Sequence, residues 1–370
     1  MNRYKNQLQD LKEQGNYRAL RSAVPQNCVN LSSNDYLDLC ANTELYSRFM
    51  AEYSQKMLPF SAASSRLLTG NSAQYAELET LLCHIFRREA ALVFNSGYHA
   101  NCGILPVFAG KRDLIIADKL VHASIIDGIR LAQADFERFR HADYAHLERI
   151  LAEKREHYDN VFIVTESIFS MDGDCADLRR LVALKQRYEC LLYVDEAHAF
   201  GVCGAQGLGV CEEQGCIADI DFLVATFGKA IASLGAFVLC CGEFRDYLIN
   251  FSRTLIFTTA LPPINLAWAS FVINQLANFG ERRENLRAVS NRCAELLEIP
   301  YQSHIIPYII GSNEGAIAQA ENLQSKGFFV LPIRYPTVPK NTARLRFSLH
   351  AGLRMSDVER LVHELKMTKL

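Results

Sequence analysis

The feature that most constrains the fold is an alternation of short β-rich runs with stretches of helical spacing. Segment 144–158, for example, places Leu147, Ile150 and Leu151 on one stripe behind an N-cap expected at Asp143. Such an alternation predicts an α/β fold in which a mostly parallel sheet is covered by helices on both faces. The predicted strands are Ala91–Phe94, Asp113–Asp118, Val161–Ser167, Leu191–Ala197, Phe222–Thr226 and Ala236–Cys241.

One strand is expected to run against its neighbours. Only about ten residues separate the runs 222–226 and 236–241, whereas a parallel pair needs a crossover of a dozen or more residues. We therefore predict that these two strands are antiparallel.

The pattern changes after Pro262 and Pro263. A long helical stretch is expected at about 264–297, followed by short strands and helices that include "IIPYII" and "ARLRFSL". We predict three parts: an N-terminal segment (1–45), a large domain (46–262), and a linking helix with a smaller C-terminal α+β domain (263–370).

Composition excludes several classes of function. The 370 residues are 49% hydrophobic and carry a formal net charge of −2, so the basic excess of a nucleic-acid binder is absent. The polar N-terminus has no apolar signal region, and the apolar runs are too short to span a membrane. The twelve cysteines form no C-x-x-C pair, and no H-E-x-x-H occurs, so no metal site is expected. These features predict a reduced, cytoplasmic protein without a nucleic-acid or membrane partner.

Two side chains at strand ends and one lysine suggest the chemistry. Asp195 ends an apolar run and His198 follows it, where open α/β sheets bind ligands. Taken alone, Asp195 is equally a helix N-cap and His198 a hydrogen-bonded loop residue. Lys229 lies just past the next strand among apolar residues, and burial favours its neutral, nucleophilic amine. Pyridoxal phosphate needs such a pair, because a lysine bonds its aldehyde and a carboxylate keeps its ring nitrogen protonated.

A phosphate would also need a binding site. Ser96, Gly97 and Tyr98 follow a predicted strand and precede a helical stretch, and peptide N–H groups at a helix N-terminus bind dianions. Thr226 offers a further hydroxyl, and His122, after another strand, offers a flat ring that stacks on a planar cofactor. The alternatives are an ordinary strand-to-helix turn and a hydrogen-bonded, half-buried histidine.

Six ordered motifs resemble those of the α-oxoamine synthases, a family of fold-type I pyridoxal-phosphate enzymes. They are "FNSGYHAN", "DKLVHASI", "VTESIFSMDGD", "YVDEAHAFGVCGAQGLG", "TFGKA" and "FTTALPP", and the resemblance extends from about Ser32 to Glu364. It implies a fold-type I transferase with a mostly parallel seven-stranded sheet, one strand of it reversed. "SSNDYL", "SRLLTGNS" and "PTVPKNTARLRFSL" favour the branch of the family that makes 8-amino-7-oxononanoate in biotin synthesis.

The resemblance also assigns roles to residues. It makes Lys229 the lysine that bonds the cofactor, Asp195 the partner of the pyridine nitrogen and His198 the contact of the ring hydroxyl. The catalytic residues are then Lys229, His122 and Asp195. The other residues implied for the cofactor are Ser96, Gly97, Tyr98, Ser170, Thr226, Thr258 and Thr259.

Substrate contacts and partners follow from the same resemblance. Thr258 and Thr259 reach the neighbouring subunit's site in this family, which implies a homodimer. Asn34 and Arg346 are implied to bind the amino acid carboxylate, for which a bidentate arginine is suited. Thr337 and Arg21 are further candidates for substrate contact, although a solvent-facing helical position explains Arg21 equally well.

The implied reaction is a decarboxylative condensation of L-alanine with pimeloyl-CoA or a pimeloyl carrier protein. Sister reactions, of glycine with acetyl-CoA or of serine with a long acyl-CoA, are the alternatives. A non-catalytic subunit of the same fold is disfavoured because Lys229, Asp195 and His198 are all present. A nicotinamide oxidoreductase is disfavoured because no G-x-G-x-x-G opens a helix after the first strand.

The chain departs from the family pattern at two places. Ala63 and Ser64 stand where the family has paired glycines, and Asp38 stands where glycine is usual. We expect these departures to affect the acyl-donor end of the site rather than the cofactor chemistry.

Overall fold

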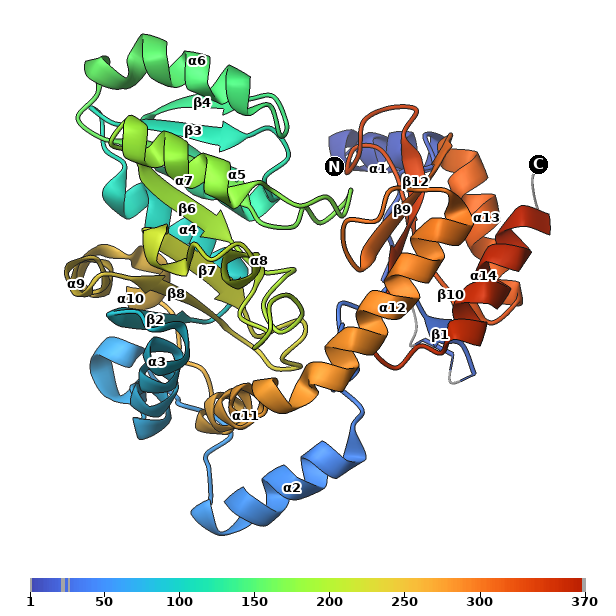
Figure 1. The fold of residues 1–370 in the computed structure, drawn as a ribbon, viewed down its shortest axis with the longest axis horizontal. Helices are drawn as coiled ribbons and strands as arrows, with labels where there is room; N and C mark the ends of the chain where they lie inside the picture. The colour runs from blue at the N-terminus through green and yellow to red at the C-terminus, as the bar shows by residue number, and fades with distance from the viewer. Residues whose placement is uncertain (1, 21–23, 26, 368–370) are drawn as a thin grey trace. The chain divides into compact units, whose positions relative to one another are not determined.

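The computed structural model describes residues 2–20, 24–25 and 27–367, which form two compact units (Figure 1). The large unit comprises Leu37–Phe169 and Asp174–Arg283. The small unit comprises the described residues within Met1–Tyr36, Ser170–Gly173 and Glu284–Leu370. These units divide after Tyr36 and Arg283, whereas the sequence analysis placed its divisions after residues 45 and 262.

The large unit contains a seven-stranded sheet whose order is β2-β8-β7-β6-β5-β3-β4. Strand β8 is antiparallel to both of its neighbours, and the remaining pairs are parallel, which confirms the predicted mixed sheet and its reversed strand. The strands are β2 (Ala90–Phe94), β3 (Leu114–Asp118), β4 (Asp135–Phe139), β5 (Val161–Glu166), β6 (Leu191–Asp195), β7 (Phe222–Thr226) and β8 (Ala236–Cys240).

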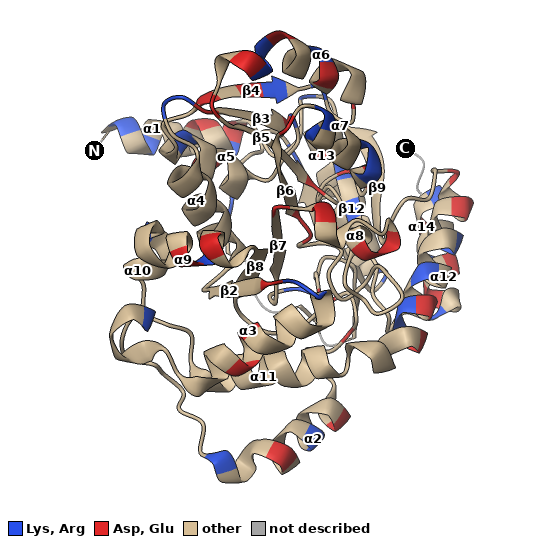
Figure 2. Cartoon of the chain, turned by 60° about the vertical axis from the view of Figure 1, so that its left-hand side comes forward, with Lys and Arg blue, Asp and Glu red and all other residues tan. Residues whose placement is uncertain are grey.

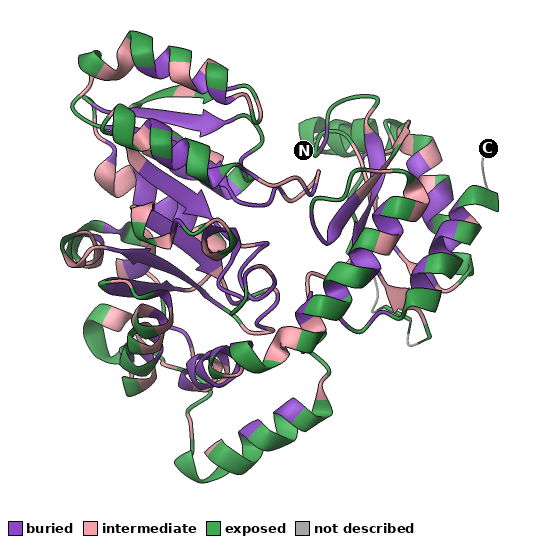
Figure 3. Ribbon diagram, in the orientation of Figure 1, coloured by how far each residue is buried: buried purple, intermediate pink, exposed green. Residues whose placement is uncertain are grey.

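Strand β4 was absent from the runs identified in the sequence. Its sequence, DFERF, is mostly charged and exposed, because β4 is an edge strand with β3 as its one neighbour. Figure 2 shows charged residues along β4 and the nearby helix α6. The central strands, by contrast, are buried along nearly their whole length (Figure 3), which is why their apolar runs were visible.

Helices alternate with most strands of the large unit from β2 onward, and several of them, such as α6, combine buried and exposed residues (Figure 3). The predicted N-cap of α6 is confirmed, because the Asp143 carboxylate accepts the His146 N–H at 2.9 Å. The helices are α2 (Thr43–Tyr53), α3 (Ala73–Phe86), α4 (Gly97–Phe108), α5 (Ala123–Leu131), α6 (Tyr144–Lys154), α7 (Leu178–Arg187), α8 (Val210–Glu213), α9 (Gly242–Phe251), α10 (Arg253–Ile256) and α11 (Pro263–Asn274). Short helical turns are η1 (Ser54–Lys56), η2 (Arg66–Gly70), η3 (Arg155–His157) and η4 (Ile217–Asp219).

The prediction of a single long helix at about 264–297 is wrong. Helix α11 ends at Asn274, the 3₁₀ turn η5 (Leu276–Phe279) follows, and α12 (Gly280–Leu297) then continues the chain into the small unit. Asparagine and glycine, which disfavour helix interiors, are concentrated at this break.

The small unit combines helices with short strands. Its three-stranded sheet, in the order β11-β12-β9, contains both strands expected from the sequence, "IIPYII" and "ARLRFSL". No helix that the structure describes is long and apolar enough to cross a membrane. The remaining elements are α1 (Asn2–Glu13), β1 (Val29–Asn30), β9 (Ile305–Gly311), α13 (Asn313–Ser325), β10 (Phe328–Phe329), β11 (Pro332–Ile333), β12 (Ala343–Ser348) and α14 (Met355–Met367).

Candidate active site

Lys229 and His198, predicted from separate loops, lie in direct contact. The Lys229 Nζ atom is 2.8 Å from His198 Nε2. The turn that carries the lysine is held by Thr226, whose hydroxyl accepts the Gly228 N–H at 3.1 Å and donates to the Gly235 carbonyl at 2.9 Å. His198 is buried and Lys229 is half-buried, so this amine is directed into the protein at the ends of β6 and β7.

Asp195 is buried at the end of β6 and receives two hydrogen bonds. The Asn101 side-chain amide donates to its Oδ2 at 2.9 Å, and the Ala197 peptide N–H donates to its Oδ1 at 2.9 Å. The helix N-cap considered for Asp195 is wrong, since the residues that follow form a turn. The carboxylate is therefore held in place by a side chain from α4.

Asn101 is a residue that sequence reasoning missed. It also donates to Ser124 Oγ at 2.9 Å and accepts a hydrogen bond from the Tyr193 hydroxyl at 2.5 Å. All of these groups are buried, so the network fixes the amide orientation. The available signal was an asparagine inside the otherwise apolar stretch of α4.

His122 caps the N-terminus of α5. Its Nδ1 accepts the Ser124 N–H at 3.2 Å and lies 2.7 Å from Ser124 Oγ. Although part of the ring is exposed, the surrounding protein desolvates it and lowers the pKa of His122. The charge on Lys229 lowers this pKa further, while the charge on Asp195 opposes the change. A neutral imidazole is the form that suits these contacts.

Ser96, Gly97 and Tyr98 form the first turn of α4, as predicted. The Ser96 hydroxyl accepts the His99 N–H at 3.2 Å as the N-cap, and Gly97 adjoins Thr226. The Tyr98 hydroxyl is exposed and donates to Asp127 Oδ2 at 2.8 Å, and that hydrogen bond raises the pKa of Tyr98 to about 12. The N–H groups of a helix N-terminus beside a threonine hydroxyl suit a phosphate dianion.

Thr258 and Thr259 lie beside this turn within the same chain. The Asn95 side-chain amide donates to Thr258 Oγ1 at 3.2 Å and to the Thr259 carbonyl at 2.6 Å. The two threonines are therefore linked to the residue that precedes Ser96.

Two further acids at the strand ends were also missed. Glu196 is fully buried and accepts from Ser167 Oγ at 2.5 Å and from the Val210 and Cys211 N–H groups at 3.1 and 2.6 Å. Burial raises the pKa of Glu196. Glu166, the last residue of β5, is 3% exposed and pairs in register with Asp195 of β6. Their positions in the sequence were the one indication of a role. Glu196 directly follows Asp195, and Glu166 lies near the end of the predicted strand Val161–Ser167.

The predicted carboxylate-binding residues lie together in the small unit. The buried Arg346 donates through Nε to the Ser170 carbonyl and through Nη1 to Ser348 Oγ at 2.5 Å and Asn34 Oδ1 at 3.3 Å. Its Nη2 donates to the Tyr36 hydroxyl at 3.3 Å. None of these partners is a carboxylate, so the guanidinium keeps its full positive charge for an anionic ligand.

Thr337 lies elsewhere in the small unit. It lines a cavity of about 620 Å³ with Arg18 and Arg334, and Arg18 Nη2 donates to its hydroxyl at 3.2 Å. Arg21, the other weak candidate for substrate contact, lies outside the described residues.

The residues that replace family glycines keep a glycine-like backbone. Asp38 has φ +56° and Ala63 has φ +52°, both in the left-handed region that costs a residue with a Cβ about 1–2 kcal/mol. Ser64 does not share this conformation, and its carbonyl accepts the Ala260 N–H at 2.9 Å.

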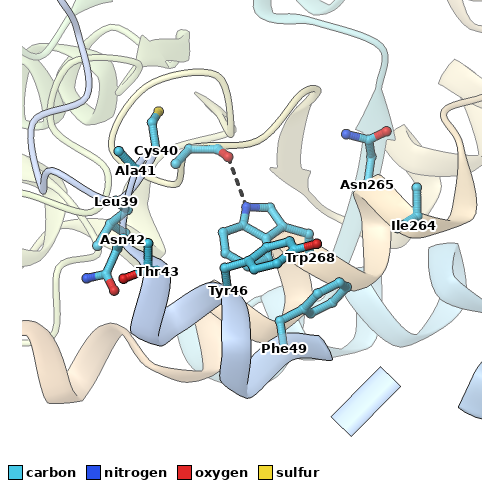
Figure 4. Close-up of a pocket in the computed structure, with 11 residues that line it drawn as sticks. Leu39, Cys40, Ala41, Asn42, Thr43, Tyr46, Phe49, Ile264, Asn265 and Trp268 are labelled. Atoms are coloured by element: carbon cyan, nitrogen blue, oxygen red, sulfur yellow. Dashed lines mark hydrogen bonds between the residues drawn. The ribbon is translucent and has the colours of Figure 1, made fainter. Parts of the chain in front are cut away.

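A separate apolar cavity of about 460 Å³ lies between α2 and α11 (Figure 4). It is lined by rings such as Tyr46, Phe49 and Trp268, and the Trp268 indole donates to the Ala232 carbonyl at 2.9 Å. None of the predicted site residues lines it, so we do not assign the chemistry to this cavity.

The chain resembles known proteins along almost its whole length. The sequence model of the family described as aminotransferase class I and II matches residues 26–365. A protein of Pasteurella multocida (strain Pm70) named "Putative 8-amino-7-oxononanoate synthase" is 52% identical over 375 residues, which cover 97% of each chain.

Solved structures show the same likeness. A serine palmitoyltransferase of S. paucimobilis with a bound PLP–myriocin adduct is 27% identical, with a TM-score of 0.89 over 98% of this chain and 96% of that chain. An 8-amino-7-oxononanoate synthase of Francisella tularensis is 28% identical, with a TM-score of 0.78 over 94% of this chain and all of the other.

Proposed function

The chain belongs to the class I and II aminotransferase family, and from this membership we propose that it makes 8-amino-7-oxononanoate for biotin synthesis. It is an enzyme, a pyridoxal-phosphate-dependent acyltransferase. In the proposed reaction, L-alanine condenses with a pimeloyl thioester of coenzyme A or a carrier protein, and carbon dioxide and the thiol are released. The contact between Lys229 and His198 beside the buried Asp195 carries the chemistry, and the P. multocida relative supports the choice of substrates.

The residues at the strand ends fit pyridoxal phosphate. Bound there, the cofactor supplies an aldehyde that bonds an amine and a ring that withdraws electrons from the substrate Cα. The first turn of α4 and the Thr226 hydroxyl suit its phosphate, and Asp195 suits its ring nitrogen. Lys229 suits the aldehyde, and the neutral ring of His122 suits stacking on the pyridine.

Lys229 is the proposed proton carrier. Its Nζ takes the proton from the substrate Cα and later returns a proton to the product. The hydrogen bond to His198 keeps Nζ aimed at the strand ends, and Asp195 holds the proton of the ring nitrogen throughout. The rigid donors on Asp195, from Asn101 and Ala197, keep that carboxylate in one orientation.

Arg346 is proposed to bind the amino acid carboxylate, with Asn34 beside it. The support is a buried guanidinium whose protein partners are hydroxyls, an amide and a carbonyl, all of which a carboxylate ligand can displace or supplement. Thr337 and the arginine-lined cavity remain a prediction for contact with the acyl substrate.

A homodimer is part of the proposal, supported by exposed apolar side chains on the large unit. Phe60, Leu68 and Phe257 are 82%, 79% and 70% exposed. The segments that carry them adjoin, because the Ala260 N–H donates to the Ser64 carbonyl. Large exposed apolar patches mark protein interfaces, and a second copy of the chain is the expected partner. Light scattering tests this, and a monomer at micromolar concentration would contradict it.

The test of the reaction is mass spectrometry of the product formed with pyridoxal phosphate, L-alanine and pimeloyl thioesters. Replacing L-alanine with glycine or serine, and the pimeloyl thioester with an acetyl or palmitoyl thioester, separates the sister reactions. Among these alternatives, the similarity to a serine palmitoyltransferase favours the serine reaction. Lys229→Ala should abolish turnover, whereas the exposed Lys111→Ala should not. Thiol release by Lys229→Ala at near the wild-type rate would refute the mechanism. A cytoplasmic location remains a prediction for cell fractionation.

A further inference from the structure

Glu166 is a buried acid that the proposed chemistry does not use. It ends β5, is 3% exposed, and its Oε1 has no hydrogen-bond partner among the residues that the structure describes. The backbone of His122 lies close enough to its carboxyl group to oppose part of the rise in the pKa of Glu166. Its neighbour in the register of β5 and β6 is Asp195, which by contrast receives N–H donors on both of its oxygens.

We propose that Glu166 is a positioning residue that works as a neutral carboxylic acid, holding the His122 peptide in place while the neighbouring Asp195 serves as the carboxylate for the ring nitrogen. This inference rests on the proposed function for the roles of His122 and Asp195.

Two adjacent buried carboxyl groups do not both ionise, because each charge disfavours the other. An ionised carboxylate needs several donors to offset its lost hydration, and Oε1 of Glu166 has none. Burial first, and then the charge on Asp195, raise the pKa of Glu166 well above its ordinary value. Asp118 at the end of β3 acts in the same direction, while Lys229 and the His122 N–H oppose it.

The arrangement has a consequence for the cofactor. A second anion beside Asp195 would change the charge balance of the ring nitrogen and of Lys229, and it would also draw a proton onto His122. A neutral Glu166 avoids both effects and still offers a carbonyl oxygen to the His122 N–H. Glutamine reproduces these properties, whereas alanine does not.

The first experiment is infrared difference spectroscopy of the full-length protein, wild type minus Glu166→Gln, at pH 7. We expect the carboxylic acid C=O band of one group per chain to be lost in the variant. Glu79→Gln, which removes the acid that pairs with Arg66 at 2.8 Å, is the matched control and should remove a carboxylate band instead. Glu196 is also buried, so the difference between the two proteins is the readout rather than the wild-type spectrum.

The second experiment uses the absorbance of the cofactor-loaded protein. Glu166→Gln should leave the midpoint of the cofactor's pH titration within about 0.3 unit of the wild type, since no charge is removed. Glu166→Ala should raise the dissociation constant of pyridoxal phosphate about tenfold, because the His122 N–H loses its acceptor. Glu166→Gln should restore most of that affinity.

The outcomes separate this inference from the proposed function. The infrared measurement needs no cofactor, so it stands even for a chain that does not bind pyridoxal phosphate. Loss of a carboxylate band in Glu166→Gln, or a fall of about one unit or more in the titration midpoint, would show that Glu166 is ionised and would overturn the proposal. If Glu166→Gln did not fold, the measurement would use Glu196→Gln labelled with ¹³C-glutamate. The buried carboxylic acid band that remains in this variant would then belong to Glu166. Absence of such a band would overturn the proposal.

Discussion

His141 forms an ionic contact whose contribution to stability can be worked from the structure. Its Nδ1 lies 2.9 Å from Asp118 Oδ1, and its Nε2 lies 2.7 Å from Asp174 Oδ2. Asp118 ends β3 and is almost fully buried, whereas Asp174 follows the turn at residues 170–172. One imidazolium therefore joins the end of β3 to the segment that follows β5.

Burial alone would lower the pKa of His141, but hydrogen bonds to the two carboxylates, and their charges, raise it to about 10. A shift from 6.5 to that value corresponds to at most about 5 kcal/mol of differential stabilisation. Because 26% of the side chain is exposed, solvent screening reduces the expected contribution to about 3 kcal/mol. The folded-state pKa is raised, so this contribution is complete below about pH 6.5 and is lost as pH rises through about 10.

The perturbation is His141→Gln, measured by urea unfolding between pH 6 and pH 10. We expect the variant to lose about 3 kcal/mol of unfolding free energy at pH 6 and about 1 kcal/mol at pH 10, where only hydrogen bonds are lost. The exposed His157→Gln is the control, with a change within about 0.5 kcal/mol at every pH. A difference that is constant across this range, or that grows with pH, would refute the assignment of a cation at His141.

Three further predictions concern the backbone and the site. Ala63→Gly should raise the unfolding free energy by about 0.5–1 kcal/mol, because it relieves a φ of +52°, whereas Ala62→Gly next to it should lower it; thermal unfolding measures both. Asn101→Leu should weaken pyridoxal phosphate binding about ten- to a hundredfold in an absorbance titration, because Asp195 loses its side-chain donor. Arg346→Lys should raise the KM for the amino acid about ten- to a hundredfold with a smaller change in kcat, since lysine cannot form a bidentate contact.

The parts of the fold that were predictable are those in which burial leaves a mark on the sequence. Strands β5, β6 and β7 read as continuous apolar runs because neighbours cover both of their faces and both of their edges. Strand β4 has one neighbouring strand and is largely exposed. Most of its side chains are therefore charged, and no continuous apolar run marks it as a strand. The break between α11 and α12 was missed because the apolar spacing continues through it, and spacing alone does not register a short 3₁₀ turn.

Burial also explains which residues of the candidate site were predictable from the sequence. Asp195, His198 and Lys229 were identifiable because each is a reactive group placed just after a buried run, where topology gathers ligands. The residues that hydrogen-bond to these groups were not identifiable, because a hydrogen bond depends on three-dimensional geometry rather than on sequence separation. Asn101 contacts Asp195 across 94 positions of sequence, and no local pattern indicates such a pair.

Asp38 and Ala63, at two of the glycine positions, keep a backbone that glycine would adopt. From the sequence, we expect Asp38, Ala63 and Ser64 to affect the acyl-donor end of the site. The structure keeps Asp38 and Ala63 in the left-handed region, and Arg282 Nη1 holds the carbonyls of Leu37 and Asp38 at 2.9 and 3.4 Å. Since the backbone retains the conformation that glycine would adopt, any effect on the substrate must come from the added side-chain atoms. The costs also differ, because aspartate tolerates this region better than alanine does. Asp38→Gly should therefore change stability less than Ala63→Gly, and an equal gain at both positions would contradict this account.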